Sequence, residues 1–299
     1  MKVTTDLIKQ LRDRTMAGMM DCKKALEASN CDMEAAIVWL REKGIAKAEK
    51  KAARVAAEGL CSYAFNGNEC VLFELNSETD FVSKNFKFLA LLDRVANIIL
   101  NSNANTTEEA LAIDVDGKSL ETVILEESSV IGEKISLRRV SRIVKTDSQV
   151  FGAYKHMGGR IAVITILENA NEVVAKDIAM HVAANQPSYV SQGDISAETL
   201  EKERAIIMTE ALNENAEAAK PKPEHIIVNN IVPGRLAKYL KEICLVDQPF
   251  VKNPDETVSV YLSHTKSTVV SFTRLAVGEG IEKEVVDFAA EVAAQAGLK

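Results

Sequence analysis

Cysteine and histidine are scarce in this chain of 299 residues, and neither has the spacing of a metal site. The five cysteines, Cys22, Cys31, Cys61, Cys70 and Cys244, include no pair two to four residues apart, as a zinc site would require. The four histidines are scattered along the chain. Reduced thiols in a cytosolic protein explain this pattern most simply, and we predict neither a metal site nor a cofactor.

Long apolar runs are also absent. The first residues carry charges and lack the apolar stretch of a signal peptide. The richest apolar stretch, residues 88–100, is interrupted by Asp93 and Arg94, and it is shorter than the roughly 18 residues that cross a bilayer. We therefore expect a cytoplasmic protein with no membrane partner.

The sequence lacks the common motifs of nucleotide binding and hydrolysis. It has no GxGxxG loop, no GxxxxGK loop followed by Ser or Thr, no GxSxG elbow and no HExxH. The paired carboxylates Glu126-Glu127 and Glu282 to Glu284 lie in charged helical contexts, which is typical of a solvated surface. Because no nucleophile, base and oxyanion donor converge, we predict that the protein is not an enzyme.

Charge is distributed unevenly along the chain. The net charge of -7 argues against broad affinity for a phosphate backbone, so we expect no direct nucleic-acid partner. Residues 1–59, however, carry more basic than acidic side chains. An RNA-associated ribosomal factor therefore stays open as an alternative, with steep salt dependence of RNA binding as its test.

Residues 1–54 are predicted to form a small module of three helices and a linker. Leu7, Ile8 and Leu11 recur at helical spacing, and a third helix should begin behind Asp32 and end before Gly44. The module is similar to ubiquitin-associated (UBA) domains. Residues 45–58 are rich in Ala, Lys and Glu and predict a helical linker. Three methionines, Met16, Met19 and Met20, surround Gly18. They either form an adaptable surface for a partner or fill the core of the module.

The segment Asn76 to Phe86, NSETDFVSKNF, lies between a predicted strand (70–75) and a predicted helix (84–99). Thr79 and Asp80 are typical of a helix N-cap. The cap does not account for Phe81, which either packs into its own domain or projects toward a partner. Most apolar loop residues complete a core, so spacing alone favours the packed position.

A pattern of strand, glycine turn, strand, loop and helix occurs twice, about 92 residues apart. The offset places Val71 over Val163 and Val82 over Val174. We interpret this as a duplicated α+β unit, with one subdomain at 55–145 and the other at 146–190 and 246–278. The second copy has Glu172-Val173 where the first has Asp80-Phe81, so a role of the first loop would be lost or changed there.

Residues 191–245 interrupt the second copy and are predicted to form an antiparallel helical hairpin, or coiled coil. Two apolar periodic stretches are separated by Lys220-Pro221-Lys222-Pro223, which a helix cannot cross undisturbed. Residues 279–299 predict a C-terminal helical module with Val285 and Phe288 on one face. The predicted fold is α+β: a UBA-like module, two α+β copies with antiparallel sheets, the inserted hairpin and the last helix.

Five segments carry a more specific signal. In chain order they are LRDRTMAGMMDCKKAL, ETDFVSKN, IAMHVAA, CLVDQPFVKNP and VGEGIEKEVVDFAAEV. Together they resemble the elongation factor Ts family, the guanine-nucleotide exchange factors of elongation factor Tu, over essentially the whole length. The resemblance implies a translation elongation factor, acting in protein biosynthesis, that promotes GDP release from elongation factor Tu and allows GTP to rebind.

The resemblance also implies roles for individual residues. The turn Thr79 to Val82 is expected to insert into the GTPase domain of elongation factor Tu near its bound Mg²⁺. The last helix is expected to dock on the same partner. The further residues that match partner-contacting positions of the family are Arg12, Met19, Met20 and His156. The three prolines of the hairpin segment, Pro221, Pro223 and Pro233, depart from the family pattern and leave its dimerising role open, so a homodimer, a 2:2 complex and contact with the partner are all retained.

Two other functions compete with this interpretation. Taken literally, the first module makes the chain a ubiquitin-type adaptor, and a pull-down with ubiquitin against one with the GTPase separates the two. An unrecognised hydrolase is the remaining alternative.

Overall fold

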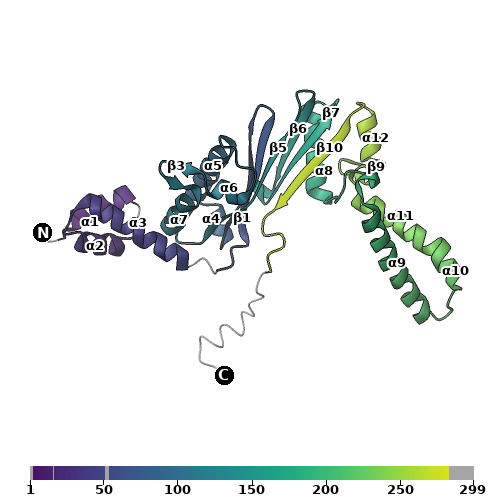
Figure 1. Ribbon diagram of the computed structural model, residues 1–299, viewed down its shortest axis with the longest axis horizontal. Coiled ribbons are helices and arrows are strands. Elements are labelled where there is room, and N and C mark those ends of the chain that lie inside the picture. The colour runs from purple at the N-terminus through teal and green to yellow at the C-terminus, as the bar shows by residue number, and fades with distance from the viewer. Residues whose placement is uncertain (1–2, 16, 51–53, 283–299) are drawn as a thin grey trace, which may run out of the picture. The chain divides into compact units, whose positions relative to one another are not determined.

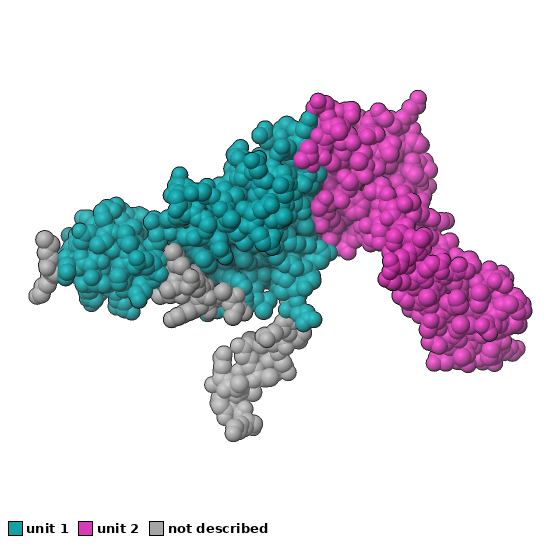
Figure 2. Space-filling model, viewed as in Figure 1, with its two compact units in different colours: residues 1–143, 275–299 teal, residues 144–274 magenta. Residues whose placement is uncertain are grey.

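The computed structural model describes residues 3–15, 17–50 and 54–282, with the side chains of residues 45–50 excepted. The chain divides into two compact units, Met1–Ile143 with Leu275–Lys299, and Val144–Arg274 (Figure 2). Both contain helices and β-sheet, which confirms the predicted α+β class. Nearly all of the predicted C-terminal module (279–299) lies outside the described residues. Among the helices that the structure does describe, none is long and apolar enough to span a bilayer.

The first unit begins with three helices, α1 (Thr5–Thr15), α2 (Met19–Ala28) and α3 (Met33–Lys50). Their small core consists of Leu11, Cys22, Ala25, Leu26 and Ala36. The likeness to UBA domains stays a prediction.

The predicted end of the third helix before Gly44 is wrong, because α3 continues to Lys50. A Cβ atom at Gly44 would lie 2.5 Å from Ser129 Oγ, so the glycine lets α3 pass close to a later helix of the same unit. The predicted helical linker to Glu58 is also wrong at its end, since strand β1 begins at Glu58.

The first α+β copy contains a three-stranded sheet in the order β1-β2-β5, formed by Glu58–Asn66, Glu69–Ser77 and Ile135–Val144. β1 and β2 pair antiparallel through a turn at Gly67, which has a φ of 56° that glycine adopts readily. Apolar side chains of this sheet and of the helices form one core that includes Val71, Phe73, Leu75, Val82, Phe88, Leu92, Val95 and Leu120. The remaining elements of this copy are α4 (Asp80–Ser83), α5 (Phe86–Leu100), α6 (Thr107–Leu111), β3 (Asp114–Val115), β4 (Lys118–Ser119) and α7 (Leu120–Ile131).

The second copy has the same plan within the other unit. Its sheet has the order β10-β7-β6, formed by Thr268–Ala276, Ile161–Glu168 and Gln149–His156, and its long helix is α8 (Glu172–Asn185). In both sheets the central strand is the second strand of an antiparallel hairpin, and a helix follows that strand in the sequence. This agrees with the predicted duplication. The remaining elements are β8 (Pro249–Phe250), β9 (Asn253–Thr257) and α12 (Val258–Ser263).

An inserted hairpin interrupts the second copy, as predicted. Helix α9 (Ala197–Glu217) and helix α11 (Val232–Ile243) run side by side (Figure 1). They are joined through the proline-containing segment, α10 (Glu224–Ile226) and a π-helical stretch, Ile227–Ile231. Ile207, Ala211, Ile227 and Val232 form the core of the hairpin. A role in dimer formation stays a prediction.

Candidate functional site

The turn after β2 is a separate, very short helix. Helix α4 spans only Asp80–Ser83, and two residues separate it from α5, which begins at Phe86. Asn85 caps α5 by accepting a hydrogen bond from the N–H of Lys87. Thr79 stands at the N-cap position of α4 with extended backbone angles, but its side chain accepts no capping hydrogen bond. Its hydroxyl instead donates to Glu133 Oε1 at 2.7 Å. The sequence therefore located the cap residue and missed the partner of its side chain.

Phe81 projects away from its own fold. Its side chain is 81% exposed, whereas the next residue, Val82, is 8% exposed and belongs to the core of the first copy. The packed position that the spacing favoured for Phe81 is therefore wrong, because the ring is exposed to solvent, and its insertion into a partner stays a prediction. The buried valine anchors a turn that displays an aromatic ring to solvent.

Asp80 adds a negative charge beside that ring. One of its carboxylate oxygens lies 2.7 Å from Lys84 Nζ, one helical turn along the chain. Both side chains are largely accessible to solvent, and exposed pairs of this kind contribute about 0–1 kcal/mol. A partner can therefore separate the pair at little cost and use either charge.

The first module presents the second group of predicted residues. Arg12 lies in the last turn of α1, and Met19 and Met20 are the first two residues of α2. All three are exposed, so Met19 and Met20 do not fill the core of the module. Met16 lies outside the described residues.

His156 is in the other unit, at the end of β6. It is exposed, and its Nδ1 lies 3.5 Å from the hydroxyl of Tyr154. The turn that follows it, which begins at the exposed Met157, has positive φ at both Gly158 and Gly159, as the predicted hairpin turn requires. The structure thus brings Thr79 to Val82 together, groups Arg12 with the two methionines, and leaves His156 on a separate unit.

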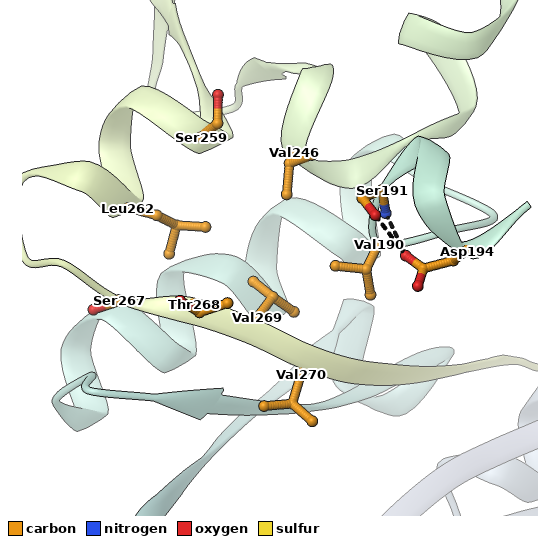
Figure 3. Close-up of a pocket in the computed structure, with 10 residues that line it drawn as sticks. All are labelled: Val190, Ser191, Asp194, Val246, Ser259, Leu262, Ser267, Thr268, Val269 and Val270. Atoms are coloured by element: carbon orange, nitrogen blue, oxygen red, sulfur yellow. Dashed lines mark hydrogen bonds between the residues drawn. The ribbon is translucent and has the colours of Figure 1, made fainter.

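Metal-ligating side chains, cysteines and a cavity are other features of the described residues that could carry chemistry. The described residues contain no group of three His, Cys, Asp or Glu side chains that could hold a metal ion. None of the five cysteines forms a disulfide bond, and burial raises the pKa of the Cys70 thiol to about 12, which keeps it protonated. A cavity of about 300 Å³ in the second unit is lined mainly by valine, serine and threonine side chains (Figure 3). Its one carboxylate, Asp194, accepts hydrogen bonds from the N–H and the hydroxyl of Ser191, as a local cap does.

Sequence reasoning missed Glu133, the residue that holds Thr79. The two are 54 positions apart, and an acidic residue after a glycine gives no local sign of such a contact. The only available signal was Gly132, whose φ of 97° ends α7 and turns the chain toward the Thr79 turn.

Comparison with known proteins agrees with the five motif segments. The family described as "Elongation factor TS" matches residues 78–279, which is more than half of the chain. The chain is 55% identical over 296 residues to a protein named Elongation factor Ts from Acholeplasma laidlawii (strain PG-8A), and the match covers 99% of each sequence. The resemblance stated from the motifs is thereby confirmed: the chain belongs to the elongation factor Ts family.

Proposed function

We propose that this protein is the guanine-nucleotide exchange factor of elongation factor Tu and acts in translation elongation in the cytoplasm. It binds the GDP-bound GTPase, promotes release of GDP, and leaves when GTP rebinds, with no covalent chemistry of its own. The observation that carries the proposal is the turn Thr79 to Val82, where a solvent-exposed Phe81 stands beside the buried Val82. An exposed aromatic on an anchored turn is suited to insertion into another protein.

The physical basis is the way a P-loop GTPase holds its nucleotide. Backbone amides, a lysine and Mg²⁺ surround the phosphates, so release is slow while all of these contacts persist. A side chain wedged near the Mg²⁺ and phosphate site disrupts several contacts at once. Burial of the Phe81 ring in the partner would contribute about 2 kcal/mol toward that disruption. As with any catalyst, the equilibrium between free nucleotides and free GTPase is unchanged.

Asp80 would act beside the ring through its charge. A carboxylate placed near the metal site can compete for Mg²⁺-bound water or for the groups that bind it. The exposed Lys84 pairs with this carboxylate at 2.7 Å, and a metal site in the partner would compete with Lys84 for it.

The remaining predicted residues would extend the contact. Arg12 offers a charged fork, and Met19 and Met20 offer flexible apolar surface that adapts to a partner. We assign these three residues, His156 and the C-terminal helix to binding of the same GTPase domain. We propose neither a nucleic acid nor a membrane as a direct partner. Light scattering with size-exclusion chromatography, on the protein alone and with nucleotide-free GTPase, would decide between a 1:1 complex and a 2:2 complex.

The test is stopped-flow release of fluorescent GDP from elongation factor Tu. Phe81→Ala should slow stimulated release about 30-fold at sub-saturating exchange factor, the equivalent of about 2 kcal/mol. Its melting temperature should stay unchanged, because the ring makes little contact with its own fold. Phe86→Ala is the matched control, since Phe86 is 74% exposed and only five residues away. The proposal fails if folded Phe81→Ala protein releases GDP at the wild-type rate, or if Phe86→Ala is equally slow.

A further inference from the structure

Thr79, the residue before the short helix α4, is held by a carboxylate from a distant part of the chain. The N–H of Thr79 donates to Glu133 Oε2 at 2.9 Å, and the hydroxyl of Thr79 donates to Glu133 Oε1 at 2.7 Å. Both oxygens of one carboxylate are thus used on one residue. Hydrogen bonds to an ionised acceptor are about twice as strong as neutral ones, and two on one carboxylate fix orientation as well as position.

The neighbouring residues, Glu78 and Lys134, make a similar contact in which the carboxylate comes from the other chain segment. Glu78 Oε1 accepts from the N–H of Lys134 at 2.6 Å, so residues 78–79 and 133–134 each supply a carboxylate to the other. Glu78 also pairs with Arg54 at 3.1 Å. The two chain segments are therefore joined by reciprocal contacts.

The end of α7 determines where Glu133 lies. Gly132 ends the helix with a φ of 97°, and its N–H donates to the carbonyl of Ser128. The hydroxyl of Ser128 then donates to the carbonyl of Glu133 and accepts from the N–H of Ile135. The backbone on both sides of Glu133 is thereby fixed to the last turn of a helix that is anchored in the core by Leu120, Val123 and Ile124.

Helix α4 needs this external support. It has four residues and no side-chain cap, and isolated helices shorter than about 12 residues are marginal in water. Phe81 cannot stabilise the turn either, because its ring is exposed. Internal support comes from the burial of Val82 and from the hydroxyl of Ser77, which donates to the Thr79 carbonyl.

From these contacts we propose that Glu133 is a positioning residue for nucleotide exchange. It holds the Thr79 turn in place before the partner arrives, so that Phe81 is presented in one orientation and little order is lost on binding. This inference rests on the proposed exchange function. The apparent Kd equals the intrinsic Kd divided by the fraction of molecules in the binding-competent state. A preformed turn raises that fraction and therefore lowers the concentration needed for binding.

The test measures stimulated GDP release against exchange-factor concentration. Glu133→Ala should raise the half-saturating concentration about 10-fold and leave the maximal rate within about twofold of wild type. Thr79→Val, which removes the hydroxyl donor, should shift the same parameter, and the double variant should be no worse than the more severe single variant. Thr79→Ser keeps the hydroxyl donor and should therefore shift the half-saturating concentration less than Thr79→Val does.

A second background tests whether Glu133 acts through Phe81. In Phe81→Ala protein, the further change Glu133→Ala should leave the remaining release unaltered within about twofold, since there is no ring to orient. Glu121 is an exposed carboxylate of α7, the helix that precedes Glu133, and Glu121→Ala is the control that should have no effect in either background. Melting temperatures are recorded for every variant, and Glu133→Gln replaces Glu133→Ala if the latter does not fold.

The outcomes separate this inference from the proposed function. If Phe81→Ala slows release while Glu133→Ala leaves the concentration dependence unchanged, the positioning role is wrong and the exchange function stands. The positioning role is also wrong if Glu133→Ala has the same effect with and without Phe81. If Phe81→Ala itself releases GDP at the wild-type rate, both proposals fall together.

Discussion

The two α+β copies differ in structure at the junction between the central strand and the helix that follows it. In the second copy Asn171 caps a continuous helix of 14 residues, and its side chain accepts from the N–H of Val174 at 2.9 Å. In the first copy the matching Thr79 gives its hydroxyl to Glu133, and the helix is broken into α4 and α5 at Lys84-Asn85. One junction is a self-contained helix start, and the other is a displayed turn held from outside.

The sheets beneath the two helices also differ at matching positions. In the second copy a Cβ atom at Gly152 would lie 2.0 Å from the Ala175 carbonyl oxygen, and the hydroxyl of Thr165 donates to the same carbonyl at 3.1 Å. In the first copy the matching strand pair is Ser62 and Phe73, both buried. Both of these side chains are larger than their counterparts, Gly152 and Thr165. The comparison teaches that small residues in the sheet permit a continuous helix, and that larger ones accompany a break.

Gly152→Ala should have the largest effect on stability. The new methyl group would meet backbone, which cannot move without displacing α8, and overpacking of this kind costs about 3 kcal/mol. The matched change Ser62→Ala, in the first copy, adds no volume and should cost about 1 kcal/mol through its hydroxyl. Urea unfolding followed by circular dichroism measures both. Equal losses would show that the close approach of α8 is not what separates the two junctions.

The exposed residue of each turn should differ in function. Val173 matches Phe81 and is 66% exposed, but it lies in the first turn of a helix that is capped and continuous. Phe81→Ala should slow stimulated GDP release about 30-fold, and Val173→Ala should change it less than about twofold, since a valine offers less area to bury. Both variants should keep wild-type stability. An equal loss of activity for the two would mean that both turns contact the GTPase, and the contrast between the copies would disappear.

The N-cap of the second copy, Asn171, should affect stability and not nucleotide exchange, which is the reverse of what we expect for Phe81. Asn171→Ala should lower the free energy of unfolding by about 1 kcal/mol and leave GDP release unchanged, because the cap serves only its own helix. Asn171→Asp keeps the acceptor and should cost much less. Denaturant unfolding together with the release assay measures both quantities. Slower GDP release by Asn171→Ala protein would place the second junction in the exchange site.

Part of this contrast could be predicted from the sequence. Periodicity and turn residues gave the α+β class, the repeated units, the interrupted hairpin and the location of the Thr79 turn, because these depend on residues near one another in the chain. The direction of Phe81 depended on tertiary packing, and its spacing favoured the wrong alternative. Gly44 is typical of a helix end in the sequence, but α3 continues through it. The close approach of Ser129, which is visible only in the structure, explains why this position is glycine. Glu133 escaped detection because the residue it holds is 54 positions away.

The smallest predicted effect is a loss of stability of the second copy at acidic pH. His181 is fully buried on α8, where the first copy has Leu89. Burial lowers the pKa of His181 from its ordinary 6.5, outweighing the opposite influence of Gln248. The neutral ring accepts from the N–H of Val251 at 3.1 Å and donates to Gln248 Oε1 at 2.8 Å, so a proton would replace an acceptor with a second donor.

The sign of this pH dependence follows from the lowered pKa. The unfolded chain binds the proton more readily, so stability is complete above about pH 6.5 and is lost as the pH falls through the lower folded pKa. At pH 6 the loss is at most about 0.8 kcal/mol. Urea unfolding at pH 7.5 and pH 6.0 should show a larger decrease for the wild type than for His181→Gln, which cannot titrate. Identical decreases for the two proteins would assign the acid sensitivity to groups other than His181, and the two copies would then not differ in this respect.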